Sequence, residues 1–391
     1  RFVPIDEASD FHRLVGHTLF GVSIAHAAAF VLAYARGHAS PAGVFEHVRG
    51  ATGLALLAVF AVMWVFSLSF IRRSRRFELF YFTHLLYVAW LALAIAHAPS
   101  FALWAGVPLA GFGIEQALRL FRRAPATPVV SAEALRSGVT RIELEKPTGF
   151  DFDPGDYVFL RVPAIAKREW HPFTISSAPE RDTLTVHVRS LGNWTAALRS
   201  AAERDASGLR AYVDGPYGSP SAHIFDAKNA VLIGAGIGGT PFASVLESIV
   251  LRRNGESPRA SKLAKVHFFW VNRDQYAFEW FRDLLARLEE QDREGLLDVH
   301  LCMDGRTAGA TSLGVETARE VMHAAGRSDL ITGLRTHPHV GPPDWEAMLA
   351  DVAKWHPGER VDVFFCGPPG LGAKLRRICA RHDMRFREER F

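Results

Sequence analysis

The chain has 391 residues, a length typical of two or three domains, and a formal net charge of +4 from 45 basic and 41 acidic residues. This near balance, without a stripe of basic and aromatic residues, gives no reason to expect a nucleic acid as partner. The few cysteines lack metal-ligand spacing, which excludes a disulfide framework and predicts reduced thiols at Cys302, Cys366 and Cys379.

Most of the long apolar runs lie in the first third of the chain. Four of them are each long enough to cross a hydrocarbon core of about 30 Å. They lie at Leu14 to Ala35, Ala51 to Ile71, Leu79 to Ala98 and Phe101 to Leu120. We therefore expect residues 1–124 to form a bundle of transmembrane α-helices in a lipid bilayer.

Arginine clusters beside these runs predict their orientation. The clusters are Arg72, Arg73, Arg75 and Arg76 after the second run, and Arg119, Arg122 and Arg123 around the end of the fourth. Positive charge near a membrane span favours the cytoplasmic side. The sequence thus predicts a multi-pass protein of the plasma membrane, the inner membrane of the cell, with the large C-terminal part in the cytoplasm.

Two pairs of histidines lie in or beside the apolar runs. His12 and His26 are fourteen residues apart, which on a helix rising about 1.5 Å per residue separates them by roughly 20 Å on nearly one face. His84 and His97 are thirteen apart, a rotation of about 140°, so this segment needs a bulge or bend to align them. Because neutral imidazole is a common axial ligand of haem iron, the four histidines predict two bis-histidine haems.

Two other interpretations of these histidines remain open at this point. Each histidine could simply bond a polar group on a neighbouring helix. The helices could also form a voltage-sensing or proton-conducting bundle, although they lack a regular ladder of arginines. Such a bundle has no use for the motifs that follow in the C-terminal part.

The pattern changes twice along the rest of the chain. From about Pro125, short runs divided by Gly, Pro and Asp predict an antiparallel β-barrel in 125–226. These runs are Val139 to Leu144, Tyr157 to Val162, Leu184 to Val188 and Leu209 to Val213. In 227–391, strands alternate with helix-like stretches such as Phe278 to Gln291, which predicts a parallel α/β sheet. The strands are Ala230 to Ile233, Lys265 to Val271, Val299 to Cys302 and Val361 to Phe365.

A glycine-rich loop opens the predicted α/β domain. The strand Val231 to Ile233 runs into Gly234, Gly236, Gly238, Gly239, Thr240 and Pro241, and a helix-like stretch follows. Glycines there allow backbone amides and a helix N-terminus to approach a pyrophosphate, so we expect a dinucleotide. The next strand ends at Asn272 and Arg273 in place of an acidic residue, which favours the 2′-phosphate of NADPH. The alternative is that Arg273 pairs with Asp274 or Glu279, which leaves NADH open.

The barrel carries a second candidate site. The run from His171 to Pro179 ends a strand and offers an aromatic ring, hydroxyls and backbone amides, which suit a flavin and its phosphates. Arg189, two residues after His187, is placed to bond a pyrophosphate. These residues alone are equally compatible with an ordinary barrel rim.

Together the motifs resemble the NADPH oxidase branch of the ferric reductase superfamily, from about Phe11 to Phe391. The resemblance to the superfamily rests on His171 to Pro179, His187 to Arg189, Trp194-Thr195 and Gly234 to Pro241. Asn272 to Asp274, Phe278 to Phe281 and Ile331 to Leu334 are more particular to the oxidases. The resemblance implies a haem-binding transmembrane bundle, a flavin-binding barrel and an α/β nucleotide-binding domain like that of ferredoxin-NADP reductase.

The resemblance also implies roles for individual residues. His12 and His84 would bind an inner b-type haem, and His26 and His97 an outer one, whereas His17 would not be a ligand. Cys366-Gly367-Pro368 would face the nicotinamide, the terminal Phe391 would cover the flavin ring, and Thr174 would bond near the flavin N5. The remaining FAD contacts are His171, Pro172, Phe173, Ser177, His187, Arg189, Trp194 and Thr195.

The implied function is transfer of electrons from cytoplasmic NADPH through FAD and two haems to external dioxygen, which yields superoxide. The alternative is a ferric-chelate reductase with the same electron path. The sequence departs from the family pattern at two places. Phe30 replaces a histidine common in animal oxidases, which bears on the choice of acceptor. Gly341-Pro342-Pro343 replaces a run containing an arginine, which bears on the choice between NADPH and NADH. Arg273 would then hold the 2′-phosphate alone or with Arg335.

The ends of the sequence carry two further expectations. No calcium-loop signature or other regulatory module is evident, so we expect constitutive activity without a regulatory subunit. The chain starts at Arg1 almost inside a helix, and the resemblance implies two more helices before it.

Overall fold

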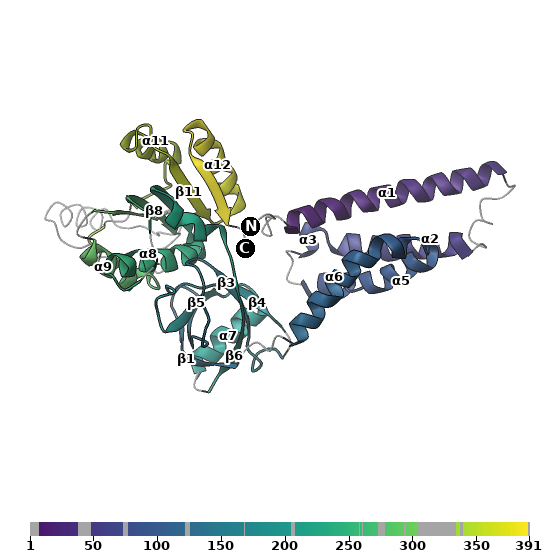
Figure 1. Cartoon of the computed structure of the whole chain (residues 1–391), viewed down its shortest axis with the longest axis horizontal. Helices are drawn as coiled ribbons and strands as arrows, with labels where there is room; N and C mark the ends of the chain where they lie inside the picture. Colours follow the sequence, from purple (N-terminus) through teal and green to yellow (C-terminus); the bar gives the residue numbers. More distant parts are fainter. Residues whose placement is uncertain are drawn as a thin grey trace. The chain divides into compact units, whose positions relative to one another are not determined.

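The computed structural model describes residues 8–37, 48–72, 77–121, 126–167, 169–204, 208–257, 259, 261–272, 278–292, 295–303, 334–336 and 339–389. Two compact units, residues 1–123 and 124–391, make up the chain (Figure 1). The first is helical. The second holds two six-stranded sheets.

The helical unit confirms the apolar runs as helices. Its elements are α1 (Ala8–Gly37), α2 (Val48–Phe66), α3 (Ser69–Arg72), α4 (Phe77–His84), α5 (Tyr87–His97) and α6 (Phe101–Phe121). Among the described residues, three segments are long and apolar enough to cross a membrane, namely Phe11–Gly37, Val48–Phe66 and Glu78–His97. The fourth predicted run is helical as α6, and among its described side chains Phe101–Glu115 form an apolar segment.

Two of the predicted helices are broken. The run expected from Ala51 to Ile71 divides into α2 and α3 at Ser67, whose hydroxyl bonds back to the carbonyl of Met63 at 2.6 Å. This local bond competes with the regular helical pattern. The other break, at Leu85-Leu86, separates α4 from α5 and supplies the bend that the spacing of His84 and His97 requires. Helix α2 packs against α1, α4 and α5.

The antiparallel sheet forms the predicted barrel. Its strands are β1 (Ala126–Ala134), β2 (Val139–Glu145), β3 (Tyr157–Arg161), β4 (His171–Thr174), β5 (Thr183–Arg189) and β6 (Arg210–Tyr217), in the order β4-β3-β6-β1-β2-β5. A bridge between Ile175 and Val186 joins the two edge strands and closes the barrel. Alternate residues such as Leu144, Leu160 and Val186 fill its core. Helix α7 (Asn193–Arg204) follows β5.

The other sheet is parallel, as predicted. Its strands are β7 (Asn229–Ala235), β8 (Lys265–Asn272), β9 (Leu297–Met303), β10 (His339–Val340), β11 (Val361–Cys366) and β12 (Arg385–Glu389), in the order β10-β9-β8-β7-β11-β12. Two apolar clusters cover it, one with α8 (Thr240–Arg253) and α9 (Arg282–Gln291), the other with α11 (Trp345–Trp355) and α12 (Pro369–Arg381). Burial on both faces explains why its central strands are almost continuously apolar.

One predicted helix begins later than expected. Residues Phe278 to Phe281 form turns before α9, because their aromatic rings pack around Trp270 in the core instead of following a helical face.

Polar contacts join the barrel to helix α8. Ser244 donates its hydroxyl proton to the carbonyl of Ser177 at 2.7 Å, and both residues are buried. The Glu247 carboxylate accepts the backbone N–H of Ala178 at 2.9 Å and pairs with Arg181 at 2.8 Å. These contacts set the flavin-type run against the start of the α/β domain.

Candidate functional site

The order of the parallel strands defines a topological switch point between β7 and β11. From β7 the chain proceeds through β8, β9 and β10 on one side, whereas β11 and β12 lie on the other. In open α/β sheets ligands bind outside the carboxyl ends of the strands at such a point. The loops that leave β7 and β11 are the glycine-rich loop and Cys366-Gly367-Pro368, so the structure brings these two predicted segments together.

The glycines allow the two loops to approach closely. A β-carbon at Gly238 would lie 2.2 Å from the carbonyl oxygen of Cys366, and one at Gly367 would lie 2.8 Å from the β-carbon of Ala235. Gly239 also has no room for a side chain, because a β-carbon there would lie 2.8 Å from the indole nitrogen of Trp270. Any larger side chain at these positions would push the loops apart.

The glycine-rich loop ends at the N-terminus of helix α8. The loop itself is a short turn of 3-10 helix, η4 (Gly236–Gly239), and Gly236 has a φ of 58°. Trp270 donates its indole proton to the carbonyl of Gly236 at 3.0 Å, and Thr240 donates its hydroxyl proton to Ile237 at 2.9 Å. Pro241 lies in the first turn of α8. The unpaired amides of this helix end make it suitable for an anion.

Arg189 extends from the barrel toward the same loop. It ends strand β5, and its Nη1 atom lies 3.7 Å from the position of a β-carbon on Gly236. The described residues provide this exposed guanidinium with no hydrogen bond or ion pair. Its place beside the helix N-terminus fits the predicted contact with a pyrophosphate.

Cys366 ends strand β11 and is buried at 3% exposure. Burial raises the pKa of its thiol well above the ordinary value, and the nearby Glu389 and Glu388 carboxylates raise it further. The thiol is therefore neutral and serves for packing and shape, since a nucleophile or base needs the thiolate.

Two aromatic rings of strand β4 pack against Trp194 of helix α7. The buried ring of Trp194 lies 4.3 Å from that of His171 and 5.7 Å from that of Phe173, whereas Pro172 is exposed on the alternate face of the strand. The indole N–H of Trp194 is buried without a hydrogen-bond partner in the part of the chain that the structure describes. The half-buried rings of His171 and Phe173 and the unused indole donor are compatible with a planar polar ligand such as a flavin beside them.

Three predicted hydroxyls differ in their surroundings. Thr174 is buried at the end of β4. The Ser177 hydroxyl donates to the carbonyl of Thr183 at 3.2 Å and accepts the N–H of Thr185 at 3.0 Å. The Thr195 hydroxyl caps the turn before α7, accepting the N–H groups of Leu191 and Gly192 at 2.9 Å each. Ser177 and Thr195 thus position the backbone of the site.

His187 connects the barrel to the Phe278 to Phe281 segment. Its Nδ1 lies 2.8 Å from the Ser176 hydroxyl, and its ring lies 4.8 Å from that of Trp280. Burial lowers the pKa of His187 to about 3, and the Arg141 charge acts in the same direction. His187 is therefore a neutral, structural ring at neutral pH.

The sequence prediction did not include Asn272 among the site residues. This side chain ends strand β8, is 3% exposed, and neither its amide oxygen nor its nitrogen has a hydrogen-bond partner among the described residues. A buried amide without partners is costly, so the position suits the ribose of a nucleotide. In the sequence, the position of Asn272 at the end of a predicted strand, next to Arg273, could have identified it as a site residue.

Some predicted residues lie outside the described part of the chain. They are Arg273 and Asp274, the terminal Phe391, Ile331 to Gly333, and the side chains or whole residues of both arginine clusters. Two described residues were predicted as partners near them. Glu279, the alternative partner of Arg273, accepts the backbone N–H of Arg136 at 3.0 Å, and the backbone N–H of Arg335 donates to Glu289 at 2.8 Å.

In the helical unit, His12 and His84 face one another. Their ring centroids are 6.0 Å apart, and the ring planes are inclined by 72°. Two metal–nitrogen bonds of about 2 Å each, together with the distance from each nitrogen to its ring centre, account for a separation of this size. The pair therefore fits a metal between two axial imidazoles. Among the described side chains, no ring contact joins His26 to His97, which lie on α1 and α5.

His17 differs from these four histidines. Its Nδ1 accepts the indole proton of Trp64 at 2.9 Å, and the Trp64 ring also stacks on Phe20 with centroids 4.7 Å apart. These contacts join α1 to α2 and give His17 a packing role, consistent with its exclusion from the predicted ligands.

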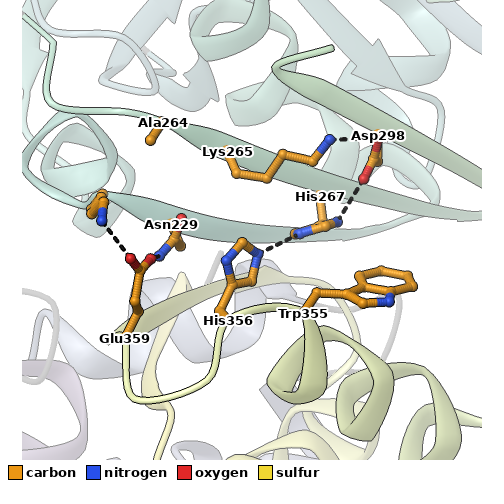
Figure 2. A pocket seen from close by; sticks show the side chains of 9 residues that line it. Asn229, Ala264, Lys265, His267, Asp298, Trp355, His356 and Glu359 are labelled. Atoms are coloured by element: carbon orange, nitrogen blue, oxygen red, sulfur yellow. Dashed lines mark hydrogen bonds and ion pairs between the residues drawn. The ribbon is translucent and has the colours of Figure 1, made fainter.

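A separate cavity of about 520 Å³ opens at the opposite, amino-terminal edge of the parallel sheet. Figure 2 shows His267 between Asp298 and His356, with distances of 3.2 Å to the carboxylate and 3.0 Å between the two Nε2 atoms. Burial lowers the pKa of His267 to about 4 despite the Asp298 carboxylate. Lys265 pairs with Asp298 at 2.8 Å, and Asn229 donates to Glu359 at 2.6 Å. We assign this cavity no ligand.

Comparison with known proteins places three family matches along the chain. Residues 2–95 match a ferric reductase like transmembrane component, 125–221 an FAD-binding domain, and 227–380 a ferric reductase NAD binding domain. Among solved structures, a ferredoxin NADP+ reductase from Neisseria gonorrhoeae with bound FAD and NADP covers 68% of this chain and 98% of its own, with 14% identity and a TM-score of 0.47.

Curated relatives match over nearly the whole chain. NADPH oxidase 5 from Homo sapiens is 36% identical over 100% of this chain and 60% of its own length, and human dual oxidase 1 is 34% identical over 97% and 27%. The chain thus spans only part of these two relatives. It spans 78% of a superoxide-generating NADPH oxidase heavy chain from Dictyostelium discoideum, at 33% identity. With the two ferric reductase matches and the FAD-binding match between them, this similarity shows that the chain belongs to the NADPH oxidase family.

Proposed function

We propose that the chain is the electron-transferring core of a transmembrane NADPH oxidase that reduces external dioxygen to superoxide. The observation that carries this is the presence, in one chain, of two facing histidines on apolar helices and of a nucleotide switch point beside a flavin-type barrel. The relative named as superoxide-generating supports the same product. Bound FAD would convert two-electron into one-electron transfer, and two bound b-type haems would relay electrons across the bilayer.

The nucleotide site binds and orients NADPH in this proposal. Backbone amides from Gly234 to Thr240 and the N-terminus of α8 hold the pyrophosphate, with Arg189 adding a charge-assisted bond. Asn272 would bind the ribose, and Arg273 would supply the charge for its 2′-phosphate. The neutral Cys366 and the following Gly367-Pro368 shape the nicotinamide pocket at the end of β11.

The barrel holds the flavin. His171, Pro172, Phe173 and Trp194 would provide its aromatic and apolar surroundings, and the Thr174 hydroxyl would be the hydrogen-bond partner near N5. Ser177, His187 and Thr195 keep the supporting backbone and rings in place through the bonds described above. Phe391 would be the aromatic residue that stacks on a bound flavin ring and makes way for the nicotinamide.

The histidines bind the haems and determine how dioxygen reacts. His12 and His84 would hold the inner haem, and His26 and His97 the outer. Two imidazoles on each bound haem would leave no place for dioxygen on the iron, so dioxygen would be reduced without binding there, and no side chain would have to transfer a proton. The barrel and the α/β domain lie in the cytoplasm of a plasma-membrane protein, and the core works without a regulatory subunit.

One observation favours a second function, ferric-chelate reduction. Phe30 lies one helical turn beyond His26 on α1 and is 42% exposed, whereas animal oxidases resembling this chain carry a histidine there. The short outer segments lack a cluster of acidic residues or histidines that would bind a metal chelate, which favours dioxygen.

The test is NADPH consumption by the purified protein with FAD, coupled to cytochrome c reduction, in air and under argon. Superoxide dismutase should abolish most cytochrome c reduction in air, and argon should stop turnover. Turnover under argon that only ferric chelates restore, with little superoxide in air, would identify a metal reductase instead.

A further inference from the structure

Two hydroxyls of helix α2 and the turn after it contact two of the predicted haem-ligand histidines. Thr52 Oγ1 lies 2.9 Å from Nδ1 of His97, and Ser67 Oγ lies 3.3 Å from Nδ1 of His84. The two contacts are fifteen residues apart, and their order shows that α2 runs antiparallel to α4 and α5. Each involves the ring nitrogen that points away from an iron bound through Nε2.

The hydroxyl proton of Thr52 is used elsewhere. Thr52 donates to the carbonyl of Val48 at 2.8 Å, with a second contact to Arg49 at 3.2 Å. A hydroxyl has one proton and two lone pairs, so the Thr52 oxygen accepts from His97 while its proton remains on the carbonyl. Nδ1 of His97 then carries the ring proton, and Nε2 keeps the lone pair that a metal requires.

The same assignment of proton and lone pairs applies to the Ser67 hydroxyl. This hydroxyl donates to the carbonyl of Met63 at 2.6 Å, which leaves the oxygen as an acceptor for Nδ1–H of His84. The repetition matters, because two independent hydroxyls each bond the carbonyl four residues earlier and each contact a different histidine. Chance placement of a single rotamer does not explain both.

Gly53 provides space for one of these rings. A β-carbon there would lie 3.1 Å from Cε1 and 3.7 Å from Nδ1 of His97. Thr52 and Gly53 thus orient the same imidazole, one through a hydrogen bond and the other through the absence of a side chain.

We propose that Thr52 and Ser67 are positioning residues that select the Nε2-ligating tautomer of His97 and His84, one residue for each haem. This inference rests on the proposed function, because it requires that the histidines bind haem. A hydrogen bond accepted from Nδ1–H also makes the imidazole more basic. A more basic axial ligand stabilises ferric over ferrous iron, so each hydroxyl lowers the potential of its own haem.

The experiment is a potentiometric titration of the two haems in the purified, full-length protein, followed in the Soret band. Thr52→Val should move only the outer-haem component, and Ser67→Ala only the inner one. We expect each ferric/ferrous equilibrium to shift roughly threefold to tenfold toward ferrous iron, and tenfold corresponds to about 59 mV for a one-electron couple. Thr52→Ser and Ser67→Thr should retain the wild-type potentials.

Matched controls separate this effect from a general disturbance of the helices. Thr83 and Ser23 make the same back-bond, to Leu79 at 2.6 Å and to Leu19 at 2.8 Å, and among the described residues neither hydroxyl contacts a histidine. Thr83→Val and Ser23→Ala should leave both potentials unchanged.

The outcomes are distinct. Haem loss from Thr52→Val that Thr52→Ser and Thr83→Val do not show supports the positioning role. If the wild type holds two haems and both haem potentials stay unchanged in Thr52→Val and in Ser67→Ala, this inference alone is overturned. Equal shifts in the control variants overturn it as well. A wild-type protein without haem overturns this inference together with the proposed function.

Discussion

The carbonyl oxygen of Cys366 lies where a β-carbon on Gly238 would come within 2.2 Å of it. This contact ties the loop after β11 to the loop after β7, and it explains why the segments predicted to bind the nicotinamide and the pyrophosphate lie side by side.

Gly238→Ala should therefore disrupt nucleotide binding. The methyl group must displace the Cys366 carbonyl or the loop, and overpacking of this kind costs about 1–3 kcal/mol. We expect roughly tenfold or more loss of NADPH affinity, measured by equilibrium binding. Gly370→Ala, where nothing lies within 4 Å of the added carbon, is the control. Equal affinity in the two variants would contradict the close approach.

Asn272→Asp should change the preference between nucleotides. A carboxylate at this strand end accepts bonds from an unmodified ribose and repels a 2′-phosphate. We expect kcat/KM for NADPH to fall about tenfold relative to that for NADH, a difference of ~1.4 kcal/mol in transition-state stabilisation. Asn254→Asp, on the surface beyond α8, should change neither value. Equal losses for both nucleotides would remove Asn272 from the ribose site.

His12 and His17 should differ when replaced by alanine. His12 faces His84, so His12→Ala should reduce the haem content from two per chain to one, measured as pyridine haemochrome. His17 is bonded to Trp64, and His17→Ala should retain both haems. Loss of one haem from His17→Ala would instead make His17 a ligand.

Gly53→Ala should disturb the outer haem. The added carbon lies 3.1 Å from the His97 ring, closer than ordinary contact, so the ring must tilt or shift. We expect an altered low-spin EPR signal for one haem and an unchanged signal for the other. Gly21→Ala, with nothing within 4 Å of the new carbon, should leave both signals as in the wild type.

His187 should make the barrel less stable in acid. Burial lowers its folded pKa from 6.5 to about 3, so below 6.5 the unfolded chain takes up a proton that the folded barrel does not. The free energy of unfolding then falls as the pH drops from 6.5 toward 3, by up to about 1.4 kcal/mol per pH unit. The loss is complete only below the folded pKa.

Thermal melts from about pH 7 to 4.5, followed by tryptophan fluorescence, test this slope. His187→Gln should show a smaller decrease in Tm than the wild type over this range. His223→Gln replaces an exposed histidine and should follow the wild type. Parallel curves for all three proteins would show that His187 does not contribute.

The helical unit could be predicted from the sequence because membrane spans need long apolar runs, but the breaks in these helices could be predicted only in part. The spacing of His84 and His97 indicated a bend, and the structure has one at Leu85-Leu86. The break at Ser67 was not predicted, because it depends on a hydroxyl that bonds its own helix and contacts a ring on another.

The sequence by itself determined the order of the parts and the glycine-rich and aromatic motifs, because apolar periodicity and glycine positions are local properties of the chain. Only the tertiary structure decided which motifs meet. The Cys366 loop reaches Gly238 because β11 inserts beside β7, and Thr52 reaches His97 because α2 packs antiparallel to α5. Such contacts join residues 45 to more than a hundred positions apart, and packing of whole elements fixes them, which no local pattern records.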